Sequence, residues 1–543
     1  LAGALTGDLL FAPQGQDQRI EARLAANGLQ LTTPLSLAVR SGQVEGTILL
    51  AEGRTTMNGR VDARGVTYNG ISLSRVAATA RLVDGAGQVQ AAFAGQQGAA
   101  FNFTTQAQIA PERIVLTGRG SLGGRPLALT TPAVLTAHGD GWEVAPTALT
   151  YAGGSATLSG RTGASPLLNA ELRRMPMSVL DVLRPDLDLG GIASGRLSYA
   201  WGTGRPQGRA DLTVRGLSRA GLVLASKPID VGVAAVLRDG RAAMRAVAVS
   251  DGRTIGRAQA RFAPLAGGSV IEALRNAPMF AQLRYAGPAD TLWRLSGVEV
   301  LDLSGPVAIG ADLGGRITDP TIRGSLRTSG ARLESSVTGM VVTDVAAAGA
   351  FSGSRLVLTS LSGRTPGGGS ISGNGTVDFA GGLPALDIRL NASDARLLAR
   401  DDIAADVTGP LAIRSNGVGG TLSGDLRLNR GRFTLGRASA AASVPQLAVR
   451  HTGLDEDEVI TSRELAPWRL DFRVRGSNLT VRGLGIDSIW TTDVEVGGRA
   501  DAPSFTGTAN LVRGNYEFAG RNFRLERGAI RFRGESPPDP LLD

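Results

Sequence analysis

The sequence predicts an all-β protein built on a long, twisted, mainly antiparallel sheet with one apolar face and a few short helices. Three observations lead to this fold class. Apolar and charged residues alternate in short runs along nearly the whole chain. Glycine accounts for 75 of 543 residues, and turn-forming residues recur roughly every 7 to 12 positions. Aromatic residues make up only 4%, and cysteine is absent, which excludes disulfide scaffolds, cysteine-ligated metal sites and thiol nucleophiles.

The alternation is clearest in the last quarter of the chain. Apolar and charged residues alternate over 470–475, and again over 523–526 and 530–533. Side chains two apart on a strand share a face, so each run predicts a strand with one apolar and one charged face. We expect Gly476-Ser477-Asn478 and Arg527-Gly528 to turn the chain between such runs. The residues predicted to share the apolar face are Leu470, Phe472, Val474, Leu479, Val481, Phe523, Leu525, Ile530 and Phe532.

The frequent turns imply hairpin after hairpin, and hence antiparallel pairing. One strand in every ~10–12 residues would give roughly 40–50 strands at about 4.8 Å spacing. A sheet of that size must twist and curl. Since too few helices are present to cover its apolar face, the sheet either closes on itself as a packed core or stays open around an apolar cargo.

Two stretches interrupt the strand pattern. Residues 175–184 read as a short amphipathic helix stopped by Pro185, and residues 270–295 carry helical signals at both ends. We therefore divide the chain into residues 1–174, 175–296 and 297–543. All three consist of strand repeats, and the middle part is interrupted by the short helices.

The charge balance favours a solvated surface over a nucleic-acid site. Lys and Arg number 57 against 48 Asp and Glu, a formal net charge of +9. The arginines are spread along the chain, whereas nucleic-acid-binding proteins gather basic residues in patches with stacking aromatics between them. We predict no nucleic-acid partner.

No catalytic, metal-binding or cofactor-binding pattern is evident. Lys227, the only lysine, lies in Ser-Lys-Pro, which excludes a phosphate-binding P-loop. His138 and His451 both lie beside turn residues, which favours surface histidines over a catalytic triad. The acidic run 455–458 lacks the alternating spacing of a calcium loop. We predict a protein that is not an enzyme and that uses no cofactor.

The C-terminal end carries a resemblance to a known family. Its sequence reads GNYEFAGRNFRLERGAIRFRG over 514–534, followed by PPDPLLD over 537–543. This looks like the G-x-Y, Phe, L/I-E-x-G-x-I-x-F and Pro-x-Leu signature of the TamB family of translocation and assembly module subunits. The segments 287–297, 302–306 and 185–195 are similar to the form of that family found in α-proteobacteria.

The resemblance implies membership of the AsmA-like, bridge-type lipid-transfer superfamily, in which a twisted sheet forms an open groove or β-taco with an apolar interior. Such proteins are anchored in the inner membrane and cross the periplasm. Members work with the outer-membrane barrel protein TamA, and both phospholipid delivery and outer-membrane protein assembly have been proposed for them. We expect the membrane anchor and the barrel-contacting part to lie outside these 543 residues.

The resemblance therefore implies a periplasm-spanning bridge that carries phospholipids between the inner and outer membranes in support of outer-membrane biogenesis. The nine apolar residues would line the lipid groove, and phospholipid acyl chains, membranes at both ends and a TamA-like barrel would be the partners. Two alternatives remain open. One is a chaperone-like scaffold for outer-membrane protein or autotransporter assembly with TamA, and the other is a β-helix adhesin passenger, which would be mainly parallel.

Overall fold

The fold is described from a computed structural model of the chain. The chain divides into two compact units, Leu1–Gly267 and Gly268–Asp543, and each is described by itself. The described residues are 2–14, 17–31, 37–68, 71–97, 99–182, 189–201, 205–219, 227–265, 270–295, 301–335, 338–380, 384–417, 419–435, 468–500, 502–535 and 541–543.

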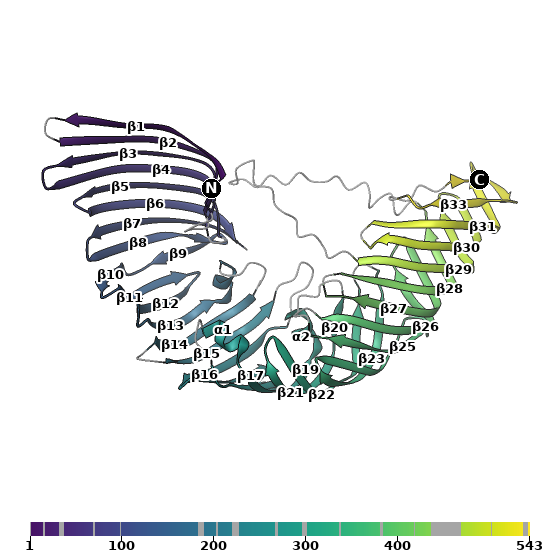
Figure 1. Cartoon of the computed structure of the whole chain (residues 1–543). Coiled ribbons are helices and arrows are strands. Elements are labelled where there is room, and N and C mark those ends of the chain that lie inside the picture. The colour runs from purple at the N-terminus through teal and green to yellow at the C-terminus, as the bar shows by residue number, and fades with distance from the viewer. Residues whose placement is uncertain are drawn as a thin grey trace. The chain divides into compact units, whose positions relative to one another are not determined.

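The first unit is built from strands and one 3-10 helix, η1 (Met177–Val182) (Figure 1). Its strands are β1 (Ala2–Gln14), β2 (Asp17–Leu31), β3 (Leu37–Ala51), β4 (Arg54–Tyr68), β5 (Ile71–Val83), β6 (Ala86–Gln97), β7 (Ala99–Ala110), β8 (Arg113–Leu122), β9 (Arg125–Leu129), β10 (Ala133–His138), β11 (Gly141–Tyr151), β12 (Gly154–Arg161), β13 (Leu167–Pro176), β14 (Leu189–Trp201), β15 (Pro206–Arg219), β16 (Ile229–Arg238), β17 (Arg241–Ser250) and β18 (Arg253–Phe262).

Consecutive strands of this unit pair antiparallel. The exceptions are the short strands β9 and β10, which do not pair with each other. Both lie between β8 and β11 and pair with each of these two strands, so together they take the place of one strand. Several hairpins close through two residues that both have positive φ, as in Asp84-Gly85, Asp239-Gly240 and Asp251-Gly252. Turns of this type match the right-handed twist of the strands and favour Asp-Gly, which is why these dipeptides predict the hairpins from sequence.

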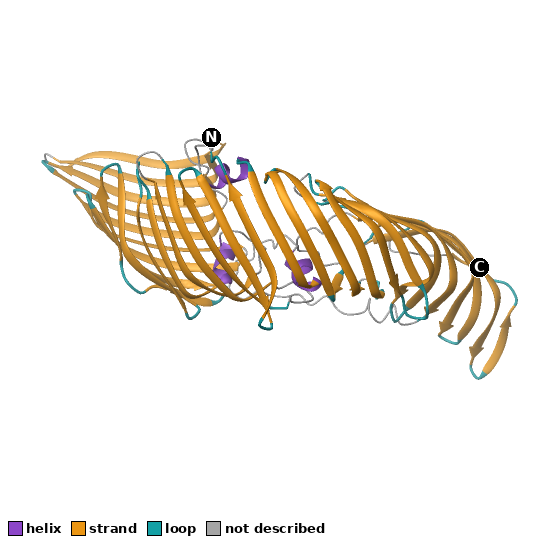
Figure 2. Ribbon diagram, turned by 90° about the horizontal axis from the view of Figure 1, so that it is seen from below, coloured by secondary structure: helices purple, strands orange, loops and turns teal. Residues whose placement is uncertain are grey.

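The second unit contains the helices α1 (Val270–Asn276) and α2 (Ala289–Leu295). Figure 2 shows how few helices accompany the strands. The strands of this unit are β19 (Met279–Pro288), β20 (Asp302–Ser304), β21 (Pro306–Arg316), β22 (Asp319–Glu334), β23 (Val341–Gly353), β24 (Arg355–Arg364), β25 (Ser370–Asp378), β26 (Ala385–Ala399), β27 (Ile403–Ser415), β28 (Gly420–Thr434), β29 (Trp468–Gly483), β30 (Ile486–Arg499), β31 (Ala502–Phe518), β32 (Arg521–Leu525), β33 (Ala529–Arg533) and β34 (Leu541–Leu542).

One pairing in this unit departs from the antiparallel rule. Strand β29 runs parallel to β28, with Leu426 opposite Val474 and Phe433 opposite Val481. Among the pairings of the described residues it is the only parallel one. A parallel neighbour requires the chain to return to the starting end of the sheet before the next strand, and residues 436–467, which connect the two strands, lie outside the described residues.

The all-β class with mainly antiparallel pairing and few helices is confirmed. Helices occur at both places where the sequence indicates them, at Met177–Val182 and at the two ends of the 270–295 stretch. The division into three parts stays a prediction. The structure's own division into two units falls between Gly267 and Gly268.

The strands of the described residues are longer than the glycine spacing suggests. The described residues form 34 strands, of up to 17 residues. The expected turn at Gly476-Ser477-Asn478 is wrong, since β29 runs on to Gly483 and only shifts register between Gly476 and Leu479. The Arg527-Gly528 break is no hairpin turn either, because β32 and β33 both pair with β31.

Many of these mid-strand irregularities are β-bulges centred on a residue with positive φ. Gly330 (φ 73°) and Asp394 (φ 48°) lie at such register shifts in β22 and β26. The residues after them, Ala331 and Ala395, are both 0% exposed. A bulge bends its strand and increases the local twist, so these sites curve the sheet while keeping a small side chain packed at the bend.

Candidate functional site

All nine residues predicted to share an apolar face do so in the second unit. Opposite residues in neighbouring strands share a face, and the register connects them in cross-strand rows. The rows are Leu422–Leu470, Gly424–Phe472–Val496–Phe505, Leu426–Val474–Val494–Gly507–Phe532, Leu428–Gly476–Thr492–Ala509–Ile530, Gly431–Leu479–Trp490–Leu511, Phe433–Val481–Ser488–Gly514–Leu525 and Ile486–Tyr516–Phe523. We call this surface the C-terminal apolar face.

The side chains of this face are mostly half-buried. Val481 is buried, at 6% exposure, whereas Phe523 is 50% exposed. The other seven predicted residues are intermediate. Phe472, Val474 and Leu479 pack against a cluster that includes Val407, Leu426 and Leu428. Side chains of this face therefore pack against one another and against the buried cluster, yet most of them stay partly exposed in the described structure.

Polar groups within the C-terminal apolar face are satisfied locally. The Ser488 hydroxyl, 2% exposed, donates to the Val481 carbonyl at 3.3 Å. It accepts a hydrogen bond from Trp490 Nε1 at 2.8 Å. Because both partners belong to the face itself, Ser488 interrupts its apolar character without leaving an unpaired buried group.

The opposite face of the same strands is charged and carries ion pairs. Arg473 approaches Asp493 at 3.4 Å and Glu495 at 3.9 Å. Arg475 pairs with Asp425 across the parallel junction at 2.8 Å, and this pairing raises the pKa of the Arg475 guanidinium. These partners alternate with the apolar residues along each strand, so the sheet separates a charged side from an apolar side.

The same separation occurs in the first unit over β14–β18. One set of cross-strand rows consists of Ala193–Val214–Val231–Ala248–Gly256, Gly195–Leu212–Val233–Ala246–Ala258, Leu197–Ala210–Ala235–Met244–Ala260 and Tyr199–Gly208–Leu237–Ala242–Phe262. No charged or polar side chain other than the Tyr199 phenol occurs in these rows. Small residues dominate, and Met244 is 36% exposed. We call this surface the N-terminal apolar face.

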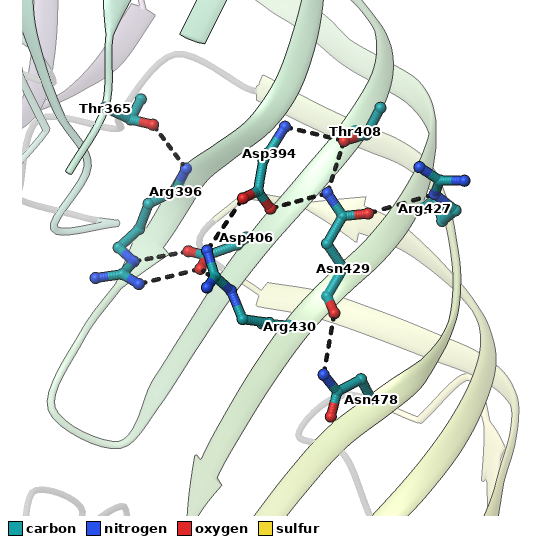
Figure 3. Close-up of polar contacts among 9 residues, drawn as sticks. All are labelled: Thr365, Asp394, Arg396, Asp406, Thr408, Arg427, Asn429, Arg430 and Asn478. Atoms are coloured by element: carbon teal, nitrogen blue, oxygen red, sulfur yellow. Dashed lines mark hydrogen bonds and ion pairs between the residues drawn. The ribbon is translucent and has the colours of Figure 1, made fainter. Parts of the chain in front are cut away.

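A network of charges holds the bulged strands on which the C-terminal apolar face is built (Figure 3). Asp406 of β27, 3% exposed, lies between two guanidinium groups. Arg396 of β26 donates to its two carboxylate oxygens at 2.7 and 3.0 Å. Arg430 of β28 donates to Asp406 Oδ2 at 3.0 Å and to Asp394 Oδ2 at 3.1 Å. We call Asp394, Arg396, Asp406, Thr408, Asn429 and Arg430 the carboxylate clasp.

The rest of the clasp satisfies the backbone of the bulge. The Asp394 amide, freed from the regular ladder, donates to Thr408 Oγ1 at 2.9 Å. Asn429 Nδ2 donates to that hydroxyl at 2.7 Å and to Asp394 Oδ1 at 3.0 Å. Asn478 Nδ2 of β29 donates to the backbone carbonyl of Asn429 at 3.3 Å. The clasp thus ties β26, β27, β28 and β29 together on the side opposite Ala395 and Val407, which belong to the apolar cluster.

Electrostatics follow from this geometry. The hydrogen bonds from Arg396 are the largest cause that lowers the pKa of Asp406, with Arg430 adding to it and burial opposing it. Asp406 in turn raises the pKa of the Arg396 guanidinium. Asp406 and Arg396 are therefore ionised at neutral pH, and the role of the clasp is to fix strands rather than to exchange protons.

No constellation for catalysis or metal binding is found in the part of the chain that the structure describes. No group of three histidine, aspartate or glutamate side chains able to hold a metal ion occurs among the described residues. His138 lies at an exposed site, with its Nε2 3.5 Å from Arg161 Nη1. His451 and the acidic run 455–458 lie outside the described residues.

The comparison with known families gives a match within the second unit, which contains the C-terminal apolar face and the carboxylate clasp. Residues 359–543 match the family model of the TamB C-terminal domain. This part of the chain is a TamB C-terminal domain. The matched region contains the nine residues of the C-terminal apolar face and the whole carboxylate clasp. A search of the curated proteins finds no match to this chain.

The TamB family itself is a non-enzymatic, periplasm-spanning transport and assembly component, and the matched domain connects this chain with the translocation and assembly module. An association with TamA and with membranes is implied at the level of the family. Within the described residues, none of the helices is long and apolar enough to cross a membrane.

The carboxylate clasp of this TamB domain is not anticipated by the sequence analysis. One usable signal is a repeat, since Ser329-Gly330-Ala331-Arg332-Leu333 and Ser393-Asp394-Ala395-Arg396-Leu397 share a pattern. Both segments form a bulge followed by a buried alanine. The shared Ser-(Gly or Asp)-Ala-Arg-Leu pattern is therefore a signal for a bulge, although it does not identify the partners of the arginine. Ala-Arg-Leu alone is not sufficient, since Glu21-Ala22-Arg23-Leu24 keeps a regular register.

Proposed function

We propose that the chain carries phospholipids along its two apolar faces, as part of a bridge that crosses the periplasm between the inner and outer membranes. The observation that supports this most directly is the continuous C-terminal apolar face, whose side chains are half-buried and backed by a charged face. An acyl chain exposed to water costs about 0.8 kcal/mol per CH₂, so a row of apolar side chains would remove much of the barrier to lipid movement.

The chemistry of the face suits acyl chains. Its residues are aliphatic and aromatic, and its buried hydroxyl is already paired within the face. Lipid headgroups would remain in water at the margin, and movement would need no nucleotide chemistry from these residues. In this proposal the protein is held in the inner membrane, and a TamA-like barrel receives the chain at the outer membrane.

The test is lipid mass spectrometry on the chain purified from the periplasm with minimal detergent. In Phe472→Asp/Ile530→Asp, two carboxylates enter the C-terminal apolar face. We expect lipid binding about tenfold weaker at each changed site, since the apolar contact of one such side chain amounts to about 1.5–3 kcal/mol. The matched control is Thr506→Asp/Thr508→Asp, which adds the same charge to exposed positions on the opposite face of β31.

A second measurement keeps the test valid if the double variant folds poorly. A photo-crosslinking amino acid placed at Leu470, Phe472 or Val474 should capture phospholipid, whereas the same group at Asp471 or Arg473 should not. Equal capture at both sets of positions, or a lipid-free wild-type protein, would overturn the proposal.

A scaffold for outer-membrane protein assembly is the second candidate. The observation that favours it is β32, which among the described residues pairs only with β31 and so presents one unpaired edge. Such an edge can accept a strand from another protein. Capture of unfolded barrel protein, instead of lipid, by crosslinkers at Arg521–Leu525 would favour this function. The adhesin alternative requires parallel coils, and the antiparallel ladder does not fit it.

A further inference from the structure

The outward face of β16–β18 in the first unit carries a patch that the proposed lipid path does not use. On the side opposite the N-terminal apolar face, the cross-strand rows read Val236–Ala243–Arg261, Ala234–Arg245–Gln259 and Gly232–Val247–Arg257. Val236 is 48% exposed and Val247 is 39% exposed. We call Ala234, Val236, Ala243, Arg245, Val247 and Arg257 the arginine–valine patch.

The patch combines uncompensated positive charge with exposed apolar side chains. Arg257 lies opposite Val247, and Arg245 is two residues from Val247 on the same strand. Arg245 and Arg257 are therefore diagonal neighbours on adjacent strands, and such neighbours lie about 7–8 Å apart. Neither arginine takes part in an ion pair given for the described residues, in contrast to Arg473 and Arg475 in the second unit. Two like charges are thus held close together without a counter-charge.

Three acidic side chains on or next to β15 and β16 have their contacts with other groups than Arg245 and Arg257. Asp211 of β15 forms an ion pair with Arg209 at 2.6 Å. Asp230, at the start of β16, accepts a hydrogen bond from the Gly216 amide at 2.9 Å. Asp239, in the turn after β16, lies 3.4 Å from Arg238. The charge of the patch is therefore left for a partner.

We propose that the arginine–valine patch docks the first unit onto the surface of an anionic phospholipid bilayer. Guanidinium groups bind phosphate in a bidentate manner and shed water more readily than an ammonium group does. Basic residues beside an anionic bilayer add to its binding, and small apolar side chains between them can enter the headgroup boundary. A sheet face that offers arginines around exposed valines matches this surface in charge and in polarity.

This contact is separate from lipid carriage. The patch lies on the outward face, whereas the acyl chains of carried lipids would lie on the opposite face of the same strands. Vesicle binding and lipid co-purification can therefore be lost independently.

The experiment measures co-sedimentation of the full chain with vesicles of phosphatidylcholine alone or mixed with phosphatidylglycerol, at low and high salt. The wild-type protein should bind the anionic vesicles in a salt-sensitive way. In Arg245→Glu/Arg257→Glu the partition coefficient should fall by about fivefold or more for each arginine. The control Arg113→Glu/Arg119→Glu makes the same charge change on β8, at exposed positions of the same unit, and should retain most of the binding.

A second variant tests the apolar contribution. Val236→Ser/Val247→Ser keeps the charge and should weaken binding to anionic vesicles while leaving the salt dependence unchanged. Equal losses in the patch and control arginine variants, or equal binding to neutral vesicles, would overturn the proposal. The proposal would also be overturned if the serine variant bound anionic vesicles as well as the wild type and polyaspartate displaced the protein from them. The patch would then recognise acidic groups without using its valines, as expected for an acidic protein partner. Retained co-purifying lipid in the arginine variants is expected.

Discussion

The variant Gly324→Val should destabilise the second unit by about 3 kcal/mol or more. Gly324 lies in the middle of β22 with a φ of 156°, and a Cβ at this position would lie 1.9 Å from the Gly310 carbonyl oxygen and 2.8 Å from the Ala311 Cα. Both neighbours are backbone atoms of β21, so the side chain cannot be accommodated without separating the two strands. Urea unfolding followed by tryptophan fluorescence measures the loss.

The matched control for this variant is Gly314→Ala in β21. No heavy atom lies within 4 Å of a Cβ built on Gly314, and its φ is not in the left-handed region. Alanine there should be neutral, or stabilising by about 0.4–1 kcal/mol, because it restricts the unfolded chain. Equal unfolding midpoints for the two variants would show that strands β21 and β22 separate readily, contrary to the described register.

The variant Asp406→Asn should cost the second unit about 2–3 kcal/mol at neutral pH. Removing one partner of a buried ion pair costs about 3–5 kcal/mol, and the value is lower here because the side chains of Arg396 and Arg430 are 36% and 55% exposed. The change leaves both guanidinium groups without their shared carboxylate. The urea midpoint at pH 7 measures this loss.

The effect of Asp406→Asn should depend on pH in one direction. Since the pKa of Asp406 is lowered in the folded protein, its stabilising contribution is fully present above the unfolded value of about 3.9 and is lost as the pH falls through the folded value. The difference between wild type and variant should therefore shrink below about pH 4.

The control for the clasp is Asp493→Asn, which removes an exposed partner of Arg473. At 53% side-chain exposure, this pair should contribute less than about 1 kcal/mol. Similar losses for the two aspartate variants would mean that the clasp acts as an ordinary surface ion pair, and its assigned role in holding β26–β28 would be wrong.

The alternation of residues is sufficient to place side chains on a face. Leu470, Phe472 and Val474 are separated by charged residues. Because successive side chains of a strand point to opposite faces, the three apolar residues lie on one face and the charged residues on the other. The same holds for Phe523 and Leu525, and for Ile530 and Phe532. Within each run the common face therefore follows from local sequence. That the runs share one face depends on the register shift after Gly476 and on pairing through β30 and β31. That they line a lipid path stays a prediction, because no local pattern specifies what covers a face.

Glycine is where prediction from sequence fails. Asp239-Gly240 closes a hairpin, Gly476 lies at a register shift within one strand, and Gly324 permits a close backbone approach. The three environments share the same residue type, and turn prediction treats them alike. Which of them occurs depends on the neighbouring strand, and so the predicted strands were too short.

What the sequence by itself determined about this protein is the β class, the Asp-Gly hairpins, the sites of the short helices and the apolar face within each alternating run. All of these depend on residues within a few positions of one another. Only the tertiary structure decided the parallel junction of β28 and β29, the bulges and the carboxylate clasp. The contact between Arg430 and Asp394 spans 36 residues of sequence, and an interaction over that distance exists only once the intervening strands have paired.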